Sequence, residues 1–308
     1  MDNNYGKNRF WRLISPLLIF VALNTLAQMI ISTYILAQSR MGEILEAMEG
    51  QRVTFGNIMY IQNNLSPEDV AETTRLIVSY APYILVFGAV LTLIYSVFTF
   101  RKDRKDEIEA GLFTKKVPKI WQYSLIAGLG LAVCFGLSFL LIMLQMAFPG
   151  FRASQVAGTG GALSVVPFWF RLLGLGVVIA VAEEYIFRGL IFKRQRETNG
   201  FVRSMMMSSL FFAIIHSTTI QMIYAFALGL LCAYVYEKFG SLIAPIILHV
   251  AASVTSLLLV ESNGLVWFFQ EPMRVGIAVV LAAFIGSSLF VFLRGAHISS
   301  EVIEEKGT

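Results

Sequence analysis

Long apolar runs follow one another along most of this sequence and determine the class of fold. Hydrophobic residues make up 56% of the 308 residues and charged residues only 14%, with a mean hydropathy of +0.70. Soluble domains rarely exceed half apolar residues, whereas a helix needs about 20 of them to cross a bilayer. We therefore predict an all-α, polytopic membrane bundle of about eight helices. The predicted spans cover residues 13–36, 81–100, 123–148, 167–192, 204–217, 220–239, 242–260 and 275–293.

The basic residues between these spans indicate how the chain is oriented. Cytoplasmic loops carry an excess of Lys and Arg, and such residues gather in residues 1–12, 101–119 and 193–203 and at Arg294. With eight spans these positions share one side, so we predict a multi-pass protein of the cell membrane with both termini in the cytoplasm. The net charge of +4 is modest, which argues against a nucleic-acid partner. Loop 101–119 either anchors this topology or binds anionic lipid heads.

The predicted spans divide the chain into three regions. Residues 1–120 form an N-terminal region of two spans with a long outer loop and a basic cytoplasmic loop. Residues 121–295 form a helical core, and residues 296–308 a cytoplasmic tail. Within the outer loop, Ser66 begins the sequence Ser-Pro-Glu-Asp, which is typical of a helix start. This part is either a short surface helix or a plain loop.

Small and sulfur-containing residues within the spans are assigned structural roles. The third predicted span contains Gly128, Gly130 and Gly136, which favour close packing of helices in a membrane. No strand and helix flank them in the way that a dinucleotide-binding motif requires. Cys134 and Cys232 lie in apolar runs, so we expect free, buried thiols.

Charged residues inside an apolar span are the first candidates for function. Near the end of the fourth predicted span, Glu183 and Glu184 adjoin each other and Arg188 follows. Two carboxylates in an apolar helix cost several kcal/mol unless they are paired, hydrated or near a cavity. At about 100° per residue, Glu184 and Arg188 share a helix face, whereas Glu183 points about 140° away from Arg188. Glu183 is therefore the candidate general base or acid. The alternative is a structural salt-bridge cluster.

Two of the three histidines lie within predicted spans. His216 follows Phe212 by one helical turn, and His249 precedes Ser253 by one turn. Ionisable residues in spans face inward and pair, so we expect both histidines to share a polar site with the glutamates. The predicted topology places His216 at the outer end of a short fifth span. A shared site therefore requires this span to stop partway across the membrane.

These residue types suit the hydrolysis of an amide without a covalent intermediate. A glutamate beside an imidazole can hold and deprotonate a water molecule, and a second imidazole or a hydroxyl can stabilise the developing oxyanion. The sequence has neither a GxSxG nucleophile elbow nor an HExxH zinc helix. On ligand type alone, Glu183, His216 and His249 could also hold a zinc ion, so the cofactor stays open between none and zinc.

Three motifs occur in an order that resembles a known family. EEYIFR at 183–188 fits EExxxR, FAIIH at 212–216 fits FxxxH, and HVAAS at 249–253 is similar to HxxxN with serine in place of asparagine. Their order and spacing resemble the CPBP family of intramembrane proteases, also called the CAAX protease or bacteriocin-processing (Abi) family. Each motif alone is weak, but three in order in a polytopic chain are specific together. The resemblance covers residues 120–260.

The resemblance implies an all-helical, glutamate-type endopeptidase. The implied site consists of the catalytic residues Glu183, His216, His249 and Ser253 and of the supporting residues Glu184, Arg188 and Phe212. In the family's scheme the first two activate water, the next two stabilise the oxyanion, and the glutamate–arginine pair orients the site. Ser253 departs from the usual asparagine, because its side chain is shorter and has a single hydroxyl donor.

These residues and motifs are compatible with three functions. The first is an intramembrane endopeptidase that cleaves a membrane-anchored or lipidated protein or peptide at the cytoplasmic side. The second is a non-catalytic bacteriocin-immunity or scaffold protein of the same fold. The third is a carrier in which Glu183 and His216 relay protons, and the lack of an internal repeat argues against it.

Overall fold

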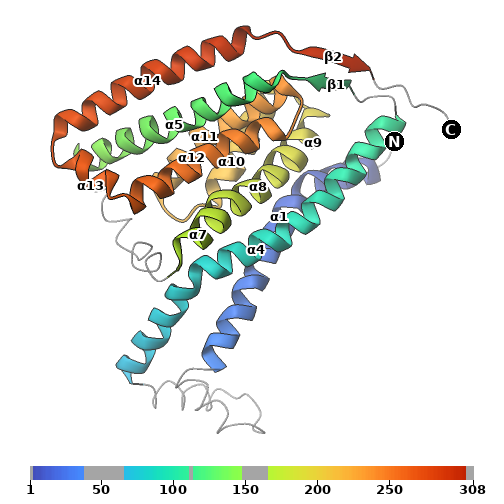
Figure 1. Cartoon of the computed structure of the whole chain (residues 1–308). Coiled ribbons are helices and arrows are strands. Elements are labelled where there is room, and N and C mark those ends of the chain that lie inside the picture. Colours follow the sequence, from blue (N-terminus) through green and yellow to red (C-terminus); the bar gives the residue numbers. More distant parts are fainter. Residues whose placement is uncertain (1–2, 38–65, 111–113, 148–165, 303–308) are drawn as a thin grey trace, which may run out of the picture.

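The computed structural model describes residues 3–37, 66–110, 114–147 and 166–302, and nearly all of them are helical (Figure 1). The predicted all-α polytopic bundle is thereby confirmed. Six of the described helices are long and apolar enough to cross a membrane, which indicates a multi-pass membrane protein. These helices are α1 (Asn3–Ala37), α4 (Pro67–Glu109), α5 (Ile120–Ala147), α11 (Thr219–Phe239), α12 (Ile243–Glu261) and α14 (Pro272–Gly295).

Shorter helical elements correspond to the fourth and fifth predicted spans. A continuous helical run, called helix 168–196 below, leads into α10 (Phe201–Ile214), and α13 (Gly264–Phe269) lies between α12 and α14. The predicted total of eight spans stays a prediction, because the run and α10 are not among the six long apolar helices. The run consists of α7 (Phe168–Phe170), η2 (Arg171–Val178), α8 (Ile179–Glu184), η3 (Tyr185–Phe192) and α9 (Lys193–Arg196).

Of the two alternatives left open at Ser66, a helix or a plain loop, the structure shows a helix start. The Ser66 hydroxyl accepts a hydrogen bond from the backbone N–H of Asp69 at 3.1 Å, and the Asp69 carboxylate accepts one from the N–H of Ser66 at 3.0 Å. This reciprocal capping box satisfies two N–H groups that a helix start leaves free. The helix is neither short nor a surface loop, because α4 runs on for 43 residues and includes the second predicted span. The rest of the predicted outer loop, residues 38–65, lies outside the described residues.

Helix 168–196 lies at the centre of the bundle. On one side α1 and α4 pack against each other and along this helix, and on the other side α12 packs against it. Beyond α12 lie α5 and then α14, while α10 and α11 pair with each other and contact η3 (Figure 1). The main cluster of buried apolar side chains surrounds η3. The glutamate pair in α8 therefore lies between α4 on one side and α12 on the other.

Gly130 brings α5 and α12 into close contact. A Cβ atom at this position would overlap the backbone carbonyl oxygen of Leu248 and would lie 3.0 Å from Cβ of Ala251. Small residues allow helix backbones to approach in membranes, so the predicted packing role is confirmed at Gly130. The expected free, buried thiols of Cys134 and Cys232 are also confirmed.

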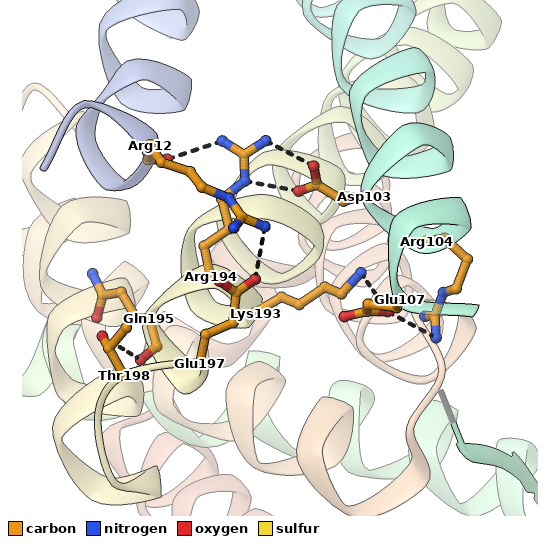
Figure 2. A network of polar contacts seen from close by, with 9 residues as sticks. All are labelled: Arg12, Asp103, Arg104, Glu107, Lys193, Arg194, Gln195, Glu197 and Thr198. Carbon is orange, nitrogen blue, oxygen red and sulfur yellow. Dashed lines mark hydrogen bonds and ion pairs between the residues drawn. The ribbon is translucent and has the colours of Figure 1, made fainter. Parts of the chain in front are cut away.

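Polar contacts tie the first two helices to the end of helix 168–196 (Figure 2). Arg194 donates to both carboxylate oxygens of Asp103, at 2.8 and 3.2 Å, and to the backbone carbonyl of Arg12 at 2.9 Å. Lys193 forms an ion pair with Glu107 at 2.9 Å. We call these five residues the polar lock. Because Asp103 and Arg194 are both buried, the lock fixes α1 and α4 against α9.

A small antiparallel sheet, which the sequence did not predict, joins β1 (Thr114–Val117) to β2 (Ser299–Val302). From β1, Nζ of Lys116 donates to the backbone carbonyl of Glu237 at 2.6 Å, near the carboxyl end of α11. A cation is favourable there because the last carbonyls of a helix lack partners. Arg196 pairs with the Glu237 carboxylate at 2.8 Å. The sheet and the polar lock therefore lie at one end of the bundle, which we call the basic end.

Candidate active site

Glu183 and Glu184 end a short α-helical segment that lies between two π-helical segments, η2 and η3. In a π-helix the backbone hydrogen bond spans five residues, and the N–H of Lys193 donates to the carbonyl of Arg188 in this way. Segments of this kind are rare and are often found at functional sites. The sequence did not predict them, because an apolar run has the same composition in either helix type.

Glu184 is fully buried and is engaged by two other groups. Its Oε1 accepts a hydrogen bond from Nη1 of Arg188 at 2.7 Å, and Nδ1 of His249 lies 2.8 Å from the same oxygen. Arg188 is also fully buried, and its Nη2 donates to the carbonyl of Gly229 at 3.1 Å. The pairing of Glu184 with Arg188 at i,i+4 spacing is therefore as predicted, and His249 is an additional partner from α12.

Glu183 is bonded less closely than its neighbour. Its Oε2 lies 3.7 Å from Nε2 of His249, which is an ion-pair distance but longer than a hydrogen bond. Its side chain is 13% exposed, against 0% for Glu184. The two nitrogens of His249 therefore face the two glutamates, with the short contact to Glu184 and the long one to Glu183.

Phe212 lies between the two histidine rings. Its ring centroid is 5.1 Å from that of His216 and 5.6 Å from that of His249, with the rings nearly perpendicular. The guanidinium of Arg188 lies 4.7 Å from the same ring, which is a favourable position for a cation over an aromatic face. The phenylalanine of the FxxxH motif thus positions two imidazoles and one guanidinium.

His216 lies in a turn and not inside a span. The α10 helix has 14 residues and ends at Ile214, and α11 begins at Thr219. Fourteen residues extend for about 21 Å, which is shorter than a bilayer core of about 30 Å. The helix is therefore short enough to stop partway across, as a shared site requires. Nδ1 of His216 lies 2.8 Å from the backbone carbonyl of Phe212, so this nitrogen carries the proton and Nε2 is left as the acceptor.

One cavity of about 500 Å³ brings most of the predicted site residues together. It is lined by Glu183, Phe212, His216, His249 and Ser253. Apolar side chains cover much of the rest of its wall, and the hydroxyls of two serines and a tyrosine add polar points that the sequence did not identify. Those additional lining residues include Ser138, Leu141, Ile142, Leu175, Ile179, Gln221, Tyr224, Ser256 and Leu257. They come from α5, η2, α8, α11 and α12, and none of them belongs to the three motifs.

Two predicted residues do not line the cavity. Glu184 and Arg188 lie behind its wall, where they hold each other and His249. In the described part of the chain, no group of three or more His, Cys, Asp or Glu side chains is arranged to hold a metal ion. The zinc site left open for Glu183, His216 and His249 is therefore not formed by these donors, although all three line the same cavity.

Comparison with known proteins agrees with the motifs. Residues 165–255 match the family model described as Type II CAAX prenyl endopeptidase Rce1-like. No match was found among curated proteins or among solved structures. The matched segment is less than half of the chain, but it contains the glutamate pair, Phe212 and both histidines of the cavity. The matched segment also carries the three motifs, and the match supports the resemblance to the CPBP family of CAAX proteases.

Proposed function

We propose that this protein is an intramembrane endopeptidase that hydrolyses a peptide bond with a water molecule activated by Glu183 and His216. The observation that carries the proposal is the shared cavity, which is lined by one glutamate, two histidines and a serine. Glu184 is bonded to Arg188 and His249, which leaves Glu183 as the carboxylate available to the cavity. Ionisable groups within a membrane bundle mark functional sites, and the family match favours proteolysis.

In the proposed reaction, the Glu183 carboxylate takes a proton from water while the water oxygen attacks the carbonyl carbon of the peptide bond. Nε2 of His216 accepts a hydrogen bond from the same water and orients it, since its Nδ1 is held by the carbonyl of Phe212. The bond between carbon and nitrogen then breaks, and Glu183 returns the proton to the leaving amine. General acid–base catalysis of this kind contributes about 10²–10⁴-fold to the rate.

The oxyanion that forms during attack is assigned to His249 and Ser253. Nδ1–H of His249 donates to Glu184, so the ring donates from Nε2 into the cavity in its imidazolium form, in which both nitrogens carry protons. The Ser253 hydroxyl is a second donor, with one hydrogen to offer where asparagine offers two. Donors placed in this way act through electrostatic stabilisation and need no further rearrangement during the reaction. Glu184 and Arg188 are positioning residues, because they act through His249.

The proposed substrate is a membrane-embedded or lipidated peptide or protein. The wall of the cavity is largely apolar and is made by helices of the bundle, which suits a chain presented within the membrane. A soluble peptide would gain little binding free energy from contact with such an apolar wall. The second candidate function is that of a non-catalytic immunity or scaffold protein. It gives no role to the glutamate, histidines and serine that line the cavity.

Substitution of Glu183 tests this proposal. Membrane peptides and proteins are compared in cells that carry the wild type, Glu183→Gln or Glu271→Gln, the last of which changes an exposed glutamate away from the cavity. New uncut species with Glu183→Gln alone, at equal levels of the three proteins, would support proteolysis and identify the substrate. Identical profiles for the three would favour the non-catalytic function.

A further inference from the structure

The catalytic cavity occupies only one half of the bundle along its long axis. In helix 168–196 its lining residues run from Leu175 to Glu183, and none of the residues that follow toward the basic end is among them. In α12, which leads away from the basic end, the lining begins at His249 and continues to Leu259. Both helices therefore line the cavity only with turns that lie at the level of the glutamate pair or farther from the basic end.

In α11 and α5, too, only the half that is farther from the basic end lines the cavity. α11 runs toward the basic end, and its lining residues are confined to its first half, from Ile220 to Leu228. α5 runs away from the basic end, and its lining residues begin at Ser138 in its second half. Figure 1 has α9 and β1 at one end of the bundle and α7 and α13 at the other. The cavity thus extends from the glutamate pair toward the end that holds α7 and α13.

The half between the glutamate pair and the basic end is closed. Arg188, Leu190, Phe192, Phe239 and Leu248 each have 0% exposure and fill this half. The polar lock lies beyond them and holds α4 and α1 against α9 (Figure 2). Interiors packed to this degree contain few voids larger than a water molecule. A substrate therefore has no route to Glu183 from this side in the described structure.

The cavity reaches the surface on its other side. Of its lining residues in the described chain, Gln221 and Ser256 are exposed, whereas the others are buried or half-buried. Gln221 lies in the first turn of α11, and Ser256 lies one turn beyond Ser253 on α12. Arg171, one turn before the lining residue Leu175, and Glu261, the last residue of α12, form an ion pair at 2.7 Å that links helix 168–196 to α12. Charged residues of this kind belong at a membrane–water boundary.

The charge distribution indicates which side this is. Basic residues that flank the helices at the basic end favour the cytoplasm for that end. Glu183 precedes Lys193 by ten residues, which is about 15 Å at the rise of a helix and about half of a 30 Å hydrocarbon core. The site then lies near the middle of the membrane, and the cavity occupies the non-cytoplasmic half.

We infer that the cavity is loaded from the non-cytoplasmic half of the membrane, so that its substrate is an apolar peptide segment inserted into or carried across that half. That the cavity receives a substrate rests on the proposed function, but the side of the membrane from which it is accessible does not. This differs from cleavage at the cytoplasmic side, which the sequence alone suggested. The apolar wall, with Leu141, Ile142, Leu175, Ile179 and Leu257, suits aliphatic or aromatic side chains next to the cleaved bond.

Thiol labelling from each side of the membrane tests the direction of access. Gln221→Cys is placed at the exposed rim, and Lys105→Cys, which is 77% exposed near the basic end, is the matched control. The native Cys134 and Cys232 are both 0% exposed, so their background is low. A charged, membrane-impermeant thiosulfonate is added to intact cells and to inside-out vesicles. Modification is read as a mass shift, which needs no enzymatic activity.

The inference predicts opposite results for the two cysteines. Gln221→Cys is modified about tenfold faster in intact cells than in inside-out vesicles, because thiol reactivity follows exposure, and Lys105→Cys shows the reverse. Faster modification of Gln221→Cys in inside-out vesicles, or no modification in intact cells, would overturn the inference. If labelling follows the prediction and Glu183→Gln accumulates no uncut species, the direction of access stands and the proposed proteolysis fails.

A second variant extends the test to the substrate. Ser256 is the other exposed lining residue, on α12, and a bulky charged thiosulfonate bound to Ser256→Cys narrows the passage to Glu183. Added to intact cells, the reagent should make Ser256→Cys accumulate the same uncut species as Glu183→Gln. The wild type, treated in parallel, should not accumulate them. Continued cleavage by a fully modified Ser256→Cys would overturn the inference that substrate passes this wall.

Discussion

The Oε1 atom of Glu184 lies 2.8 Å from Nδ1 of His249, a contact that joins helices separated by 65 residues in the chain. The same oxygen accepts a hydrogen bond from Arg188 at 2.7 Å. Glu184 is buried, its Oε1 is held by both groups, and it does not line the cavity, whereas its neighbour Glu183 does. Two adjacent glutamates therefore occupy different surroundings, and the same substitution should affect them differently.

Replacing each glutamate by glutamine separates their roles. Glu184→Gln leaves Arg188 buried without its anionic partner, so we expect a loss of about 3–5 kcal/mol in the free energy of unfolding. Glu183→Gln disturbs only the 3.7 Å contact to His249, so it should keep the stability of the wild type and lose cleavage. Both are measured by denaturant unfolding in detergent micelles and by a cleavage assay. Equal stability of the two variants would contradict the assigned pairing.

Close packing at Gly130 is tested by adding one methyl group. Gly130→Ala forces α5 away from the carbonyl of Leu248, the residue before His249, and overpacking of this kind costs about 1–3 kcal/mol. We expect a lower unfolding midpoint and slower cleavage. The matched control is Gly136→Ala on the same helix, where the new Cβ would lie 3.5 Å from Cβ of Ala282, an ordinary contact. An unchanged midpoint for Gly130→Ala would show that α12 adapts without cost.

The parts of the site that could be predicted from the sequence are local in the chain. Glu184 and Arg188 are four residues apart on one helix, so helical geometry alone places them together. The short length of the fifth span could also be seen in the sequence, but His216 was predicted inside that span, and the structure places it in the turn that follows. By contrast, the contact of His249 with Glu184 and the carbonyl of Gly229 depend on the packing of separate helices. No spacing within one segment encodes such contacts.

The fold divides in the same way between local and non-local features. Long apolar runs indicated helices, and the Ser-Pro-Glu-Asp sequence at Ser66 was typical of a helix start, because each signal depends on neighbouring residues. The two π-helical segments around the glutamate pair were not predictable, since they replace one backbone hydrogen-bond pattern by another at unchanged composition. The pairing of β1 with β2 joins strands that are far apart in the chain. Its short, polar strands carry no apolar alternation that would indicate a sheet.

The polar lock predicts that the first two helices stabilise the family-matched segment. Asp103→Ala removes the bidentate partner of Arg194, whose side chain is 7% exposed, and leaves a buried guanidinium with only the carbonyl of Arg12. We expect a loss of about 3 kcal/mol in the free energy of unfolding. The control is Glu109→Ala at the end of the same helix, where an exposed pair with Lys105 is worth at most about 1 kcal/mol. Equal, small effects of both variants would show that the lock does not hold α4 to α9.

The serine of the third motif gives the sharpest test of the oxyanion assignment. Ser253→Ala removes a donor from the cavity, and the loss of one such donor lowers kcat by about a hundredfold. Ser253→Asn introduces the residue that the HxxxN motif has at this position, and the cavity of about 500 Å³ has room for it. We expect the asparagine variant to keep or exceed the kcat of the wild type.

Ser262→Asn is the control for the effect of a larger amide on the same helix. Ser262 lies at the end of α12, where its hydroxyl bonds the carbonyl of Leu258, and it does not line the cavity. Its cleavage rate should match the wild type. A wild-type rate for Ser253→Ala would remove Ser253 from the catalytic residues. A folded but inactive Ser253→Asn would instead mean that HVAAS does not correspond to HxxxN. The oxyanion would then depend on His249 alone, whose orientation by Glu184 would become the more important contact.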